Sequence, residues 1–340
     1  CMDVEGEKGL FADIQSAEIK NLTLADGYIK TSNYAGGICT KALNSRIFNC
    51  HNSCSIITDG GMPYSGGMCG NSENSVIEKC SNTASVINTR INEWVYWVGG
   101  IVGSLDKGRV VRECYNTGEI VGSYGCGGIA GMSQSGNNLI ERCYNTGLIR
   151  GNGYSNDFIG GIVGSMNNKD IVRNCYNTGN IMGVRVGGIV AHASGTVEYC
   201  YNAGTINGTT KGAIAGWKDD GSSVTRNYYD KTVCGDAGGV NGVELSNQAY
   251  GHTTTEMCNS TLSTALNSYY DASIWQAGTT ANASTEVITD DNVFGYKIIG
   301  TYPSLKGVGE PQYAKTLWVN VGTEENQWIS QKSPLDLEWH

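Results

Sequence analysis

The chain has 340 residues, with 32 acidic and 23 basic side chains, a formal net charge of −9, 48 glycines, 4 prolines and 13 cysteines. This acidic balance argues against a general nucleic-acid binder, because the basic surface that neutralises phosphates is missing. A hydrophobic content of 40% with 16% charged residues predicts a folded core, and no apolar run approaches the ~20 residues that span a bilayer.

The chain opens with CMDVEGEKGLF at residues 1–11, which reads as the end of one strand running into the next. No signal peptide is visible in this segment. We therefore expect that both ends of the sequence are cut from a longer protein.

From residue 36 the chain repeats a Gly-Gly-aliphatic block followed by an aliphatic-x-x-Cys segment. The blocks are Gly36-Gly37-Ile38, Gly66-Gly67-Met68, Gly99-Gly100-Ile101, Gly127-Gly128-Ile129, Gly160-Gly161-Ile162, Gly187-Gly188-Ile189 and the looser Gly212-Ala213-Ile214. The cysteines are Cys50, Cys80, Cys114, Cys143, Cys175 and Cys200, separated by 30, 34, 29, 32 and 25 residues. Periods of this length indicate a solenoid, a propeller or a helical array.

Composition and length decide between these architectures. Asn, Thr, Gly and β-branched residues fill each repeat and no 3.6-residue period appears, which argues against helices. A propeller blade needs about 40 residues or more, whereas the shortest repeat here has 25. The sequence therefore predicts an all-β fold, a parallel β-helix of about eight coils over residues 1–240.

Equivalent positions of successive repeats are expected to stack. The cysteine column, which includes Cys80, Cys114, Cys143, Cys175 and Cys200, is predicted to consist of small, buried, reduced side chains. Two residues earlier the charges alternate in sign, as expected for coils in register about 4.8 Å apart; these residues are Glu78, Arg112, Glu141, Arg173 and Glu198. Outside the repeats, Cys234 and Cys258 are the predicted disulfide partners.

Three further columns follow or flank the cysteines. The asparagines Asn52, Asn82, Asn116, Asn145, Asn177 and Asn202 are expected to form a structural ladder, because a corner amide can bond both the turn backbone and its equivalent on the next coil. The glycines Gly118, Gly147, Gly179 and Gly204 are predicted to take a positive φ. The tyrosines Tyr115, Tyr144, Tyr176, Tyr201 and Tyr228 are expected to stack on one another, with a sugar-binding strip as the alternative.

The most distinctive unrepeated segment is INTRINEWVYWVGG at 87–100, which carries Trp94, Tyr96 and Trp97. Loops on a rigid scaffold often carry binding function, and exposed aromatic rings suit sugars or a protein partner. Tyr154 and Phe158, in GNGYSNDFIGG at 151–161, are candidates for the same side. The alternative is that the loop folds onto the coil face and buries its rings, which Val95 and Val98 favour.

The repeat ends near residue 241. The segment TTTEMCNSTLSTALN at 253–267 predicts a short helix, and FGYKIIGTYPSL at 294–305 predicts strands. Together they define an α+β capping region at 241–310, which would cover the open end of the stack. TLWVNVGTEENQWISQ at 316–331 predicts one or two more strands in a tail at 311–340, or the start of a further module.

The sequence contains no convincing catalytic constellation. Asp219-Asp220 and Asp290-Asp291 are paired carboxylates, and the first pair could bind a cation, although a solvated loop is the simpler interpretation. The histidines His51, His192, His252 and His340 are scattered, and no HExxH motif exists. We therefore expect no catalytic residue, no metal site and no cofactor.

The blocks GGIVG, GGIAG and GGIVG at 99–103, 127–131 and 160–164, each followed by aliphatic-x-x-Cys-Tyr-Asn-Thr-Gly, resemble the GLUG repeat. The opening at 9–29 is similar to the first coil of such arrays, and Trp275, Tyr302 and Pro303 match the tail that commonly follows them. The resemblance covers roughly residues 9–230 and loosens at 66–70 and 212–216. It implies a right-handed parallel β-helix in a large secreted or wall-attached bacterial protein, such as an adhesin-like surface protein or the N-terminal region of an IgA1-specific metallopeptidase.

The leading hypothesis is a non-catalytic extracellular scaffold, a spacer or an adhesin that binds a host protein or glycan. One alternative is a carbohydrate-active β-helix enzyme, which requires three or more charged side chains to converge in one groove. Another is an accessory N-terminal domain of a secreted metallopeptidase. We expect no nucleic-acid partner and no membrane insertion, and we expect end-to-end self-association of the cut fragment through its exposed first coil.

Overall fold

The computed structural model describes residues 2–5, 9–61, 63–243, 245, 247–268, 274–280, 288–289, 294–320 and 328–331. The chain divides into two compact units, one made of Cys1–Tyr229 and Asp236–Tyr250 and the other of Asp230–Gly235 and Gly251–His340. In the described part of the chain, no helix has the length and apolar character needed to cross a membrane.

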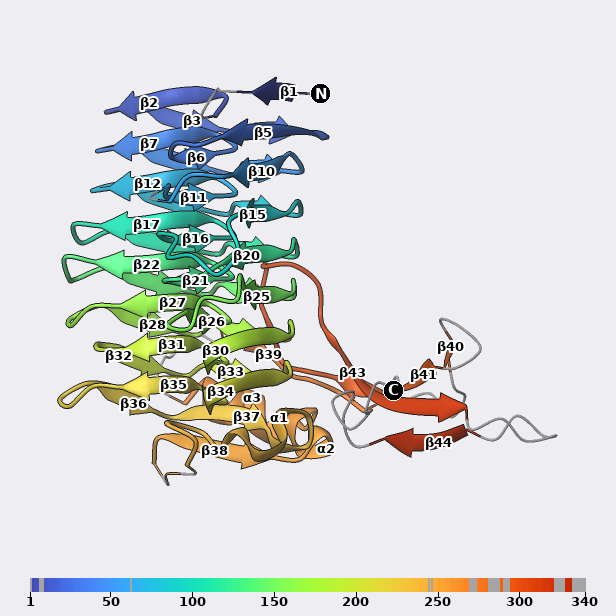
Figure 1. Cartoon of the computed structure of the whole chain (residues 1–340). Helices are drawn as coiled ribbons and strands as arrows, with labels where there is room; N and C mark the ends of the chain where they lie inside the picture. Colours follow the sequence, from blue (N-terminus) through green and yellow to red (C-terminus); the bar gives the residue numbers. More distant parts are fainter. Residues whose placement is uncertain are drawn as a thin grey trace. The chain divides into compact units, whose positions relative to one another are not determined.

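The first unit is a parallel β-helix, in which each coil repeats a set of short strands and equivalent strands stack into four sheets (Figure 1). The first sheet contains β1 (Met2–Glu5), β5 (Gly27–Thr31), β10 (Ser55–Thr58), β15 (Val86–Asn88), β20 (Ile120–Gly122), β25 (Ile149–Gly151), β30 (Ile181–Gly187), β34 (Ile206–Gly212), β26 (Phe158–Gly160), β21 (Cys126–Gly127), β16 (Val98–Gly99), β11 (Ser65–Gly66) and β6 (Ala35–Gly36). The second contains β2 (Phe11–Gln15), β7 (Cys39–Leu43), β12 (Cys69–Glu73), β17 (Val102–Asp106), β22 (Ala130–Gln134), β27 (Val163–Met166), β31 (Val190–Ala193) and β35 (Ala215–Lys218).

The remaining two sheets complete each coil. The third contains β3 (Glu18–Lys20), β8 (Arg46–Phe48), β13 (Val76–Glu78), β18 (Val110–Arg112), β23 (Leu139–Glu141), β28 (Ile171–Arg173), β32 (Thr196–Glu198) and β36 (Ser223–Thr225). The fourth contains β4 (Thr23–Leu24), β9 (His51–Asn52), β14 (Ser81–Asn82), β19 (Tyr115–Asn116), β24 (Tyr144–Asn145), β29 (Tyr176–Asn177), β33 (Tyr201–Asn202), β37 (Asn227–Asp230) and β38 (Ala249–His252). The predicted all-β parallel β-helix of about eight coils is confirmed.

The register of the coils follows the charge pattern. The residues two places before the column cysteines pair Cα to Cα through four successive coil steps, in the order Glu78, Arg112, Glu141, Arg173 and Glu198. Arg112 Nη2 lies 3.2 Å from Glu78 Oε1, and Arg173 Nη2 lies 2.8 Å from Glu141 Oε2. Partly exposed pairs of this kind contribute about 0.2–1 kcal/mol each, so they specify register more than stability.

The corner glycines contradict the prediction of a positive φ. Gly118, Gly147, Gly179 and Gly204 all lie outside the left-handed region. A side chain is excluded there by crowding instead, since a Cβ on Gly147 would lie 2.1 Å from the carbonyl oxygen of Gly118 on the preceding coil. The left-handed turn falls one residue before the column cysteine, where Lys79 and Glu113 both have φ of 55°.

The second unit holds helices and antiparallel strands. They are α1 (Lys231–Cys234), α2 (Thr254–Met257), α3 (Ser260–Leu266), β39 (Trp275–Gln276), β40 (Ile288–Thr289), β41 (Phe294–Thr301), β42 (Ser304–Leu305), β43 (Tyr313–Asn320) and β44 (Trp328–Gln331); the 3₁₀ turn η1 (Gly235–Ala237) follows α1. Antiparallel pairing joins β40, β41, β43 and β44 in one sheet and β39 with β42 in another.

Local signals explain the helices of this unit. The predicted helix at 253–267 is two helices, because Thr253 caps α2 in a capping box with Glu256 and Asn259 then caps α3. The strands predicted at 294–305 and 316–331 are present as β41 to β44, while residues 321–327 and 332–340 lie outside the described residues. Cys234 and Cys258 are both buried thiols, so the predicted disulfide between them is wrong.

Candidate functional site

The asparagine column is a continuous ladder of amide hydrogen bonds. Each Nδ2 donates to the Oδ1 of the next asparagine at 2.7–2.8 Å, in the order Asn52, Asn82, Asn116, Asn145, Asn177 and Asn202. The same Nδ2 also donates to the carbonyl two residues on, as Asn145 does to Gly147 at 2.8 Å. These amides are buried and their bonding groups are used within the stack, so the column has a structural role.

The cysteine column is equally internal. Cys80, Cys114, Cys143, Cys175 and Cys200 are fully buried, and each thiol contacts the carbonyl two residues earlier at 3.2–3.3 Å. Burial raises the pKa of the thiols of Cys114, Cys143 and Cys175 well above its usual range. A thiol that stays protonated is a poor nucleophile and a poor metal ligand.

The tyrosine column is a stack of parallel rings. The centroids of Tyr115 and Tyr144 lie 4.9 Å apart, those of Tyr144 and Tyr176 4.8 Å, and those of Tyr176 and Tyr201 5.0 Å, with interplanar angles of 5° or less. Tyr228 stacks instead on Tyr250, at 5.5 Å. Rings inside such a stack have both faces covered, which argues against a sugar-binding role for this column.

The insertion at 87–100 is held by hydrogen bonds to the coils that follow it. Ser123 Oγ accepts a hydrogen bond from the N–H of Val95 at 2.8 Å, and Asn152 Nδ2 donates to the carbonyls of Arg90 and Glu93 at 2.9 and 3.0 Å. Within the insertion, the side chains of Val95 and Val98 are fully buried, as expected if the loop folds onto the coil face. Trp94 nevertheless remains 50% exposed, so the loop fixes its backbone while keeping that ring at the surface.

The aromatic side chains of this loop belong to a larger row of rings, which we call the aromatic strip. The centroid distances along the strip are 4.3 Å for Tyr34–Tyr64, 4.6 Å for Tyr64–Trp97, 5.5 Å for Trp97–Tyr96, 5.6 Å for Tyr96–Trp94, 5.1 Å for Trp94–Tyr124, 5.6 Å for Tyr124–Phe158 and 5.3 Å for Phe158–His192. With five coil steps of about 4.8 Å each, the strip runs for about 24 Å along the stack.

Most rings of the strip are half-buried. Tyr64, Tyr96, Trp97, Tyr124 and Phe158 are all of intermediate exposure. The guanidinium carbon of Arg185 lies 5.0 Å from the centroid of Phe158. Of the residues proposed from sequence, the structure brings Trp94, Tyr96, Trp97 and Phe158 together in the strip.

Tyr154 is the exception among the sequence candidates. Its N–H donates to Asn152 Oδ1 at 3.0 Å, and its side chain is of intermediate exposure. Among the described residues, no ring contact connects it to the strip.

Sequence reasoning missed Tyr34, Tyr64, Tyr124 and His192. The signal was present for two of them, because Tyr34 and Tyr64 occupy the position two residues before the Gly-Gly block, as Trp97 and Phe158 do. This position precedes strands that pair in register, Ser65 with Val98 and Gly66 with Gly99. Tyr124 lies one residue earlier than this position, and His192 lies on β31 of the second sheet.

A serine, a histidine and an aspartate from three successive coils meet beside the last ring of the strip. Ser165 Oγ lies 3.4 Å from His192 Nδ1, and His192 Nε2 lies 3.0 Å from Asp219 Oδ1. The order matches a Ser-His-Asp triad. Sequence reasoning missed it because the three residues are 27 positions apart in the chain and meet only through coil register.

Two observations favour a structural role for this cluster. Asp219 also accepts hydrogen bonds from Ser194 at 2.6 Å and from the Trp217 indole at 3.1 Å, so its charge is shared among three donors. The strands that carry Ser165 and His192 pair in register, and N–H groups spent in a ladder cannot stabilise an oxyanion. Hydrogen bonds from Ser194 and His192 lower the pKa of Asp219.

Among the residues that the structure describes, no group of three or more His, Cys, Asp or Glu side chains is placed to hold a metal ion. Asp290, Asp291 and His340 lie outside the described residues.

Comparisons with known proteins find similarity among solved structures. No family model matches the chain, and no curated protein matches it. Among solved structures, the chain is similar to one named as a "putative immunoglobulin A1 protease" from Bacteroides ovatus, with 17% sequence identity and a TM-score of 0.44. The match covers 89% of this chain and 88% of the other.

Proposed function

We propose that the protein is a non-catalytic extracellular β-helix scaffold of a bacterial surface protein, and that its aromatic strip binds glycan. The observation that carries the proposal is the strip itself: eight rings in mutual contact over six coils, pinned by the hydrogen bonds of Ser123 and Asn152. Aromatic rings held on a rigid scaffold bind at low entropic cost, because little side-chain freedom remains to be lost.

A polymeric ligand suits this surface better than a folded protein partner. Unlike the stacked tyrosine column, the strip keeps ring surface exposed, with Trp94 50% and Tyr34 37% exposed, and it follows the coils along the stack. A glycan chain repeats along one line, and its sugar rings offer apolar C–H faces and edges to aromatic side chains. A protein hot spot would instead be a compact patch surrounded by a rim of other contacts.

The absence of a role in catalysis is inferred from how the charged side chains are used. Glu78 and Glu141 are each paired with an arginine of a neighbouring coil at 2.8–3.2 Å. Glu73 lies 3.2 Å from Lys41 Nζ and also pairs with Lys107, and these two lysines lower its pKa. A glycosidase needs two carboxyl groups facing one another across a sugar, one of them with a raised pKa.

The finer assignment is part of the same proposal. The Gly-Gly-aliphatic blocks and the Cys-Tyr-Asn-Thr-Gly segments support GLUG repeats of an adhesin-like, secreted or wall-attached protein. An accessory domain of a secreted metallopeptidase is the alternative, and a zinc-binding motif encoded downstream in the parent gene would decide for it.

A glycan array with the unmodified protein tests the proposal, with Trp94→Ala as the test variant. Tyr313→Ala is the control, because Tyr313 is 53% exposed and lies outside the strip. We expect binding to one class of glycan polymer, reduced about tenfold or more by Trp94→Ala and unchanged by Tyr313→Ala. Binding to no glycan would leave the protein as a spacer and refute the binding role.

A further inference from the structure

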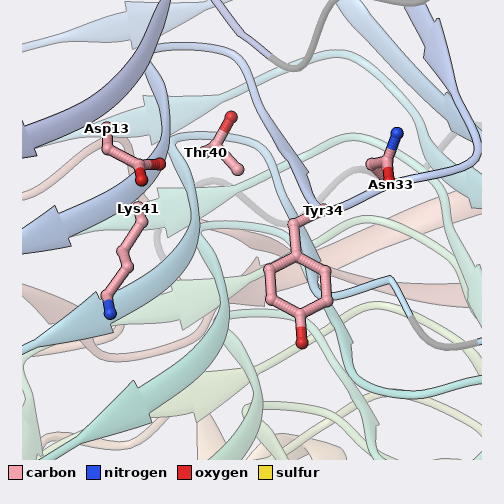
Figure 2. A pocket seen from close by; sticks show the side chains of 5 residues that line it. All are labelled: Asp13, Asn33, Tyr34, Thr40 and Lys41. Atoms are coloured by element: carbon pink, nitrogen blue, oxygen red, sulfur yellow. The ribbon is translucent and has the colours of Figure 1, made fainter.

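A pocket lies at the first ring of the aromatic strip. It has a volume of about 330 Å³ and is lined by Asp13, Asn33, Tyr34, Thr40 and Lys41 (Figure 2). These residues come from β2, from β7 and from the turn that precedes β6. The volume falls at the lower end of the range for small-molecule sites, about 300–1,000 Å³.

Tyr34 offers this pocket an aromatic face. Its ring stacks on Tyr64 with centroids 4.3 Å apart and an interplanar angle of 12°, so one face is covered. Within the described residues no ring stacks on the other face, and the side chain is 37% exposed. Further along the strip Tyr64 has ring neighbours on both sides, Tyr34 and Trp97. Tyr34 is therefore the ring of this stack that has a face available for a flat apolar surface.

Thr40 supplies a buried hydroxyl that the protein leaves unsatisfied. The residue is only 5% exposed, and its Oγ1 has no hydrogen-bond partner among the described residues. Buried hydroxyl groups almost always have a partner, so one without a protein partner points to a molecule that supplies it. Thr40 lines the pocket, which places its side chain next to any occupant.

Thr40 is also a departure from the repeat. Its register neighbours on the second sheet are glycines in five of the other seven coils, namely Gly70, Gly103, Gly131, Gly164 and Gly216, and alanines in the other two, Ala12 and Ala191. A Cβ on Gly70 would lie 2.7 Å from the carbonyl oxygen of Thr40 and 2.8 Å from that of Tyr64. The column therefore excludes side chains at Gly70, whereas the coil that lines the pocket carries a polar one.

The remaining lining groups determine the chemistry of the ligand. Asp13 provides a carboxylate acceptor and Asn33 an amide that both donates and accepts. Lys41, the register partner of Asp13, already has its ammonium 3.2 Å from Glu73 Oε2. The uncompensated charge at the pocket is thus that of Asp13, which disfavours an anionic ligand.

We propose that this pocket binds a single neutral pyranose unit, with one face of the sugar on Tyr34 and its hydroxyls bonded to Asp13, Asn33 and Thr40. This inference rests on the proposed glycan-binding function, because it assigns the terminal subsite of the same strip. A pyranose combines an apolar face with a rim of hydroxyl groups, which is the combination these side chains address.

The test uses saturation-transfer NMR with a panel of methyl glycosides of neutral hexoses and N-acetylhexosamines, followed by titration of the tightest binder. Tyr34→Ala and Thr40→Val are the test variants, and Tyr313→Ala, at an exposed ring outside the strip, is the control. Thr40→Gly installs the residue that most other coils carry, so it guards against a folding defect. We expect each pocket variant to weaken the monosaccharide about tenfold, equivalent to about 1.4 kcal/mol, and Tyr313→Ala to leave it unchanged.

The outcomes separate this inference from the proposed function. Polymer binding that depends on Trp94, without saturation transfer to any monosaccharide, would overturn the pocket and leave the strip standing. Monosaccharide binding that Tyr34→Ala and Thr40→Gly leave unchanged would also overturn the pocket. Monosaccharide binding lost in both variants, without polymer binding, would support the pocket and refute the strip.

Discussion

Replacing Asn145 by alanine tests the amide ladder, which is the most regular feature of the stack. Asn145 is fully buried and takes part in four hydrogen bonds: with Asn116 and Asn177 at 2.8 Å, and with the carbonyl and N–H of Gly147 at 2.8 and 3.3 Å. At a net value of about 1 kcal/mol for each bond, Asn145→Ala should lower the free energy of unfolding by about 4 kcal/mol.

Two matched variants sharpen this prediction. Asn52 has three such bonds, to Asn82, to the carbonyl of Cys54 and from the N–H of Cys54, so Asn52→Ala should cost about 3 kcal/mol. Ser53→Ala removes only an exposed contact to Thr83 and should cost less than about 0.5 kcal/mol.

Urea unfolding followed by circular dichroism measures these differences. Because stacked repeats can open in parts, hydrogen exchange of the amides in the coils around residue 145 provides the local value. A loss below about 1 kcal/mol for Asn145→Ala, or an equal loss for Ser53→Ala, would refute the ladder as a source of stability.

Three further predictions concern the glycine corners, the thiols and the serine cluster. Gly147→Ala should lower the melting temperature more than Gly61→Ala, because a Cβ on Gly147 meets the backbone carbonyl of Gly118 at 2.1 Å, whereas one on Gly61 has its nearest contact at 3.1 Å with the guanidinium end of the flexible Arg90 side chain; equal losses would contradict the crowding argument. The folded pKa of the column thiols is raised, so above about pH 8.5 the unfolded chain loses protons that the folded chain keeps. Stability should then fall with rising pH by about 1.4 kcal/mol per thiol per pH unit, measured as urea midpoints at pH 7, 9 and 10, and Cys143→Ala should make the fall shallower; a midpoint constant to pH 10 would count against burial. A fluorophosphonate probe should not label Ser165, and labelling that disappears in His192→Ala would establish a hydrolase instead.

The sequence predicts the stack well because each coil of a parallel β-helix must form the same side-chain contacts with the next coil. The side-chain amide of Asn116 or Asn145 forms its hydrogen bond only if the next coil presents the same group. The spacing of the repeats therefore specifies the register of the coils. The alternating charges carry the same information, and both patterns can be read without knowing the path of the chain between them.

The turns, the aromatic strip and the serine cluster depend on the three-dimensional path of the chain, which the residue types alone do not predict. Lys79 and Glu113 adopt a left-handed turn although neither is a residue that favours it, while Gly147 is small because of the coil beside it. The aromatic strip joins a repeated column to an insertion, and the contact of Trp94 with Tyr124 depends on how that insertion lies on the coils. Ser165, His192 and Asp219 meet through register, so they could be grouped only once the coil alignment was known.

The amide ladder runs in one direction only. From Asn52 to Asn202 every Nδ2 donates toward the higher-numbered coil, so the side-chain dipoles add up along the axis and polarise one another. The row is closed at both ends within the stack, where Asn52 pairs with Leu24 of the coil before it and Asn202 pairs with Tyr229 of the coil after it. Turning over a single amide inside the row would place two donors face to face on one side and two acceptors on the other, so the column gives the tower a polarity.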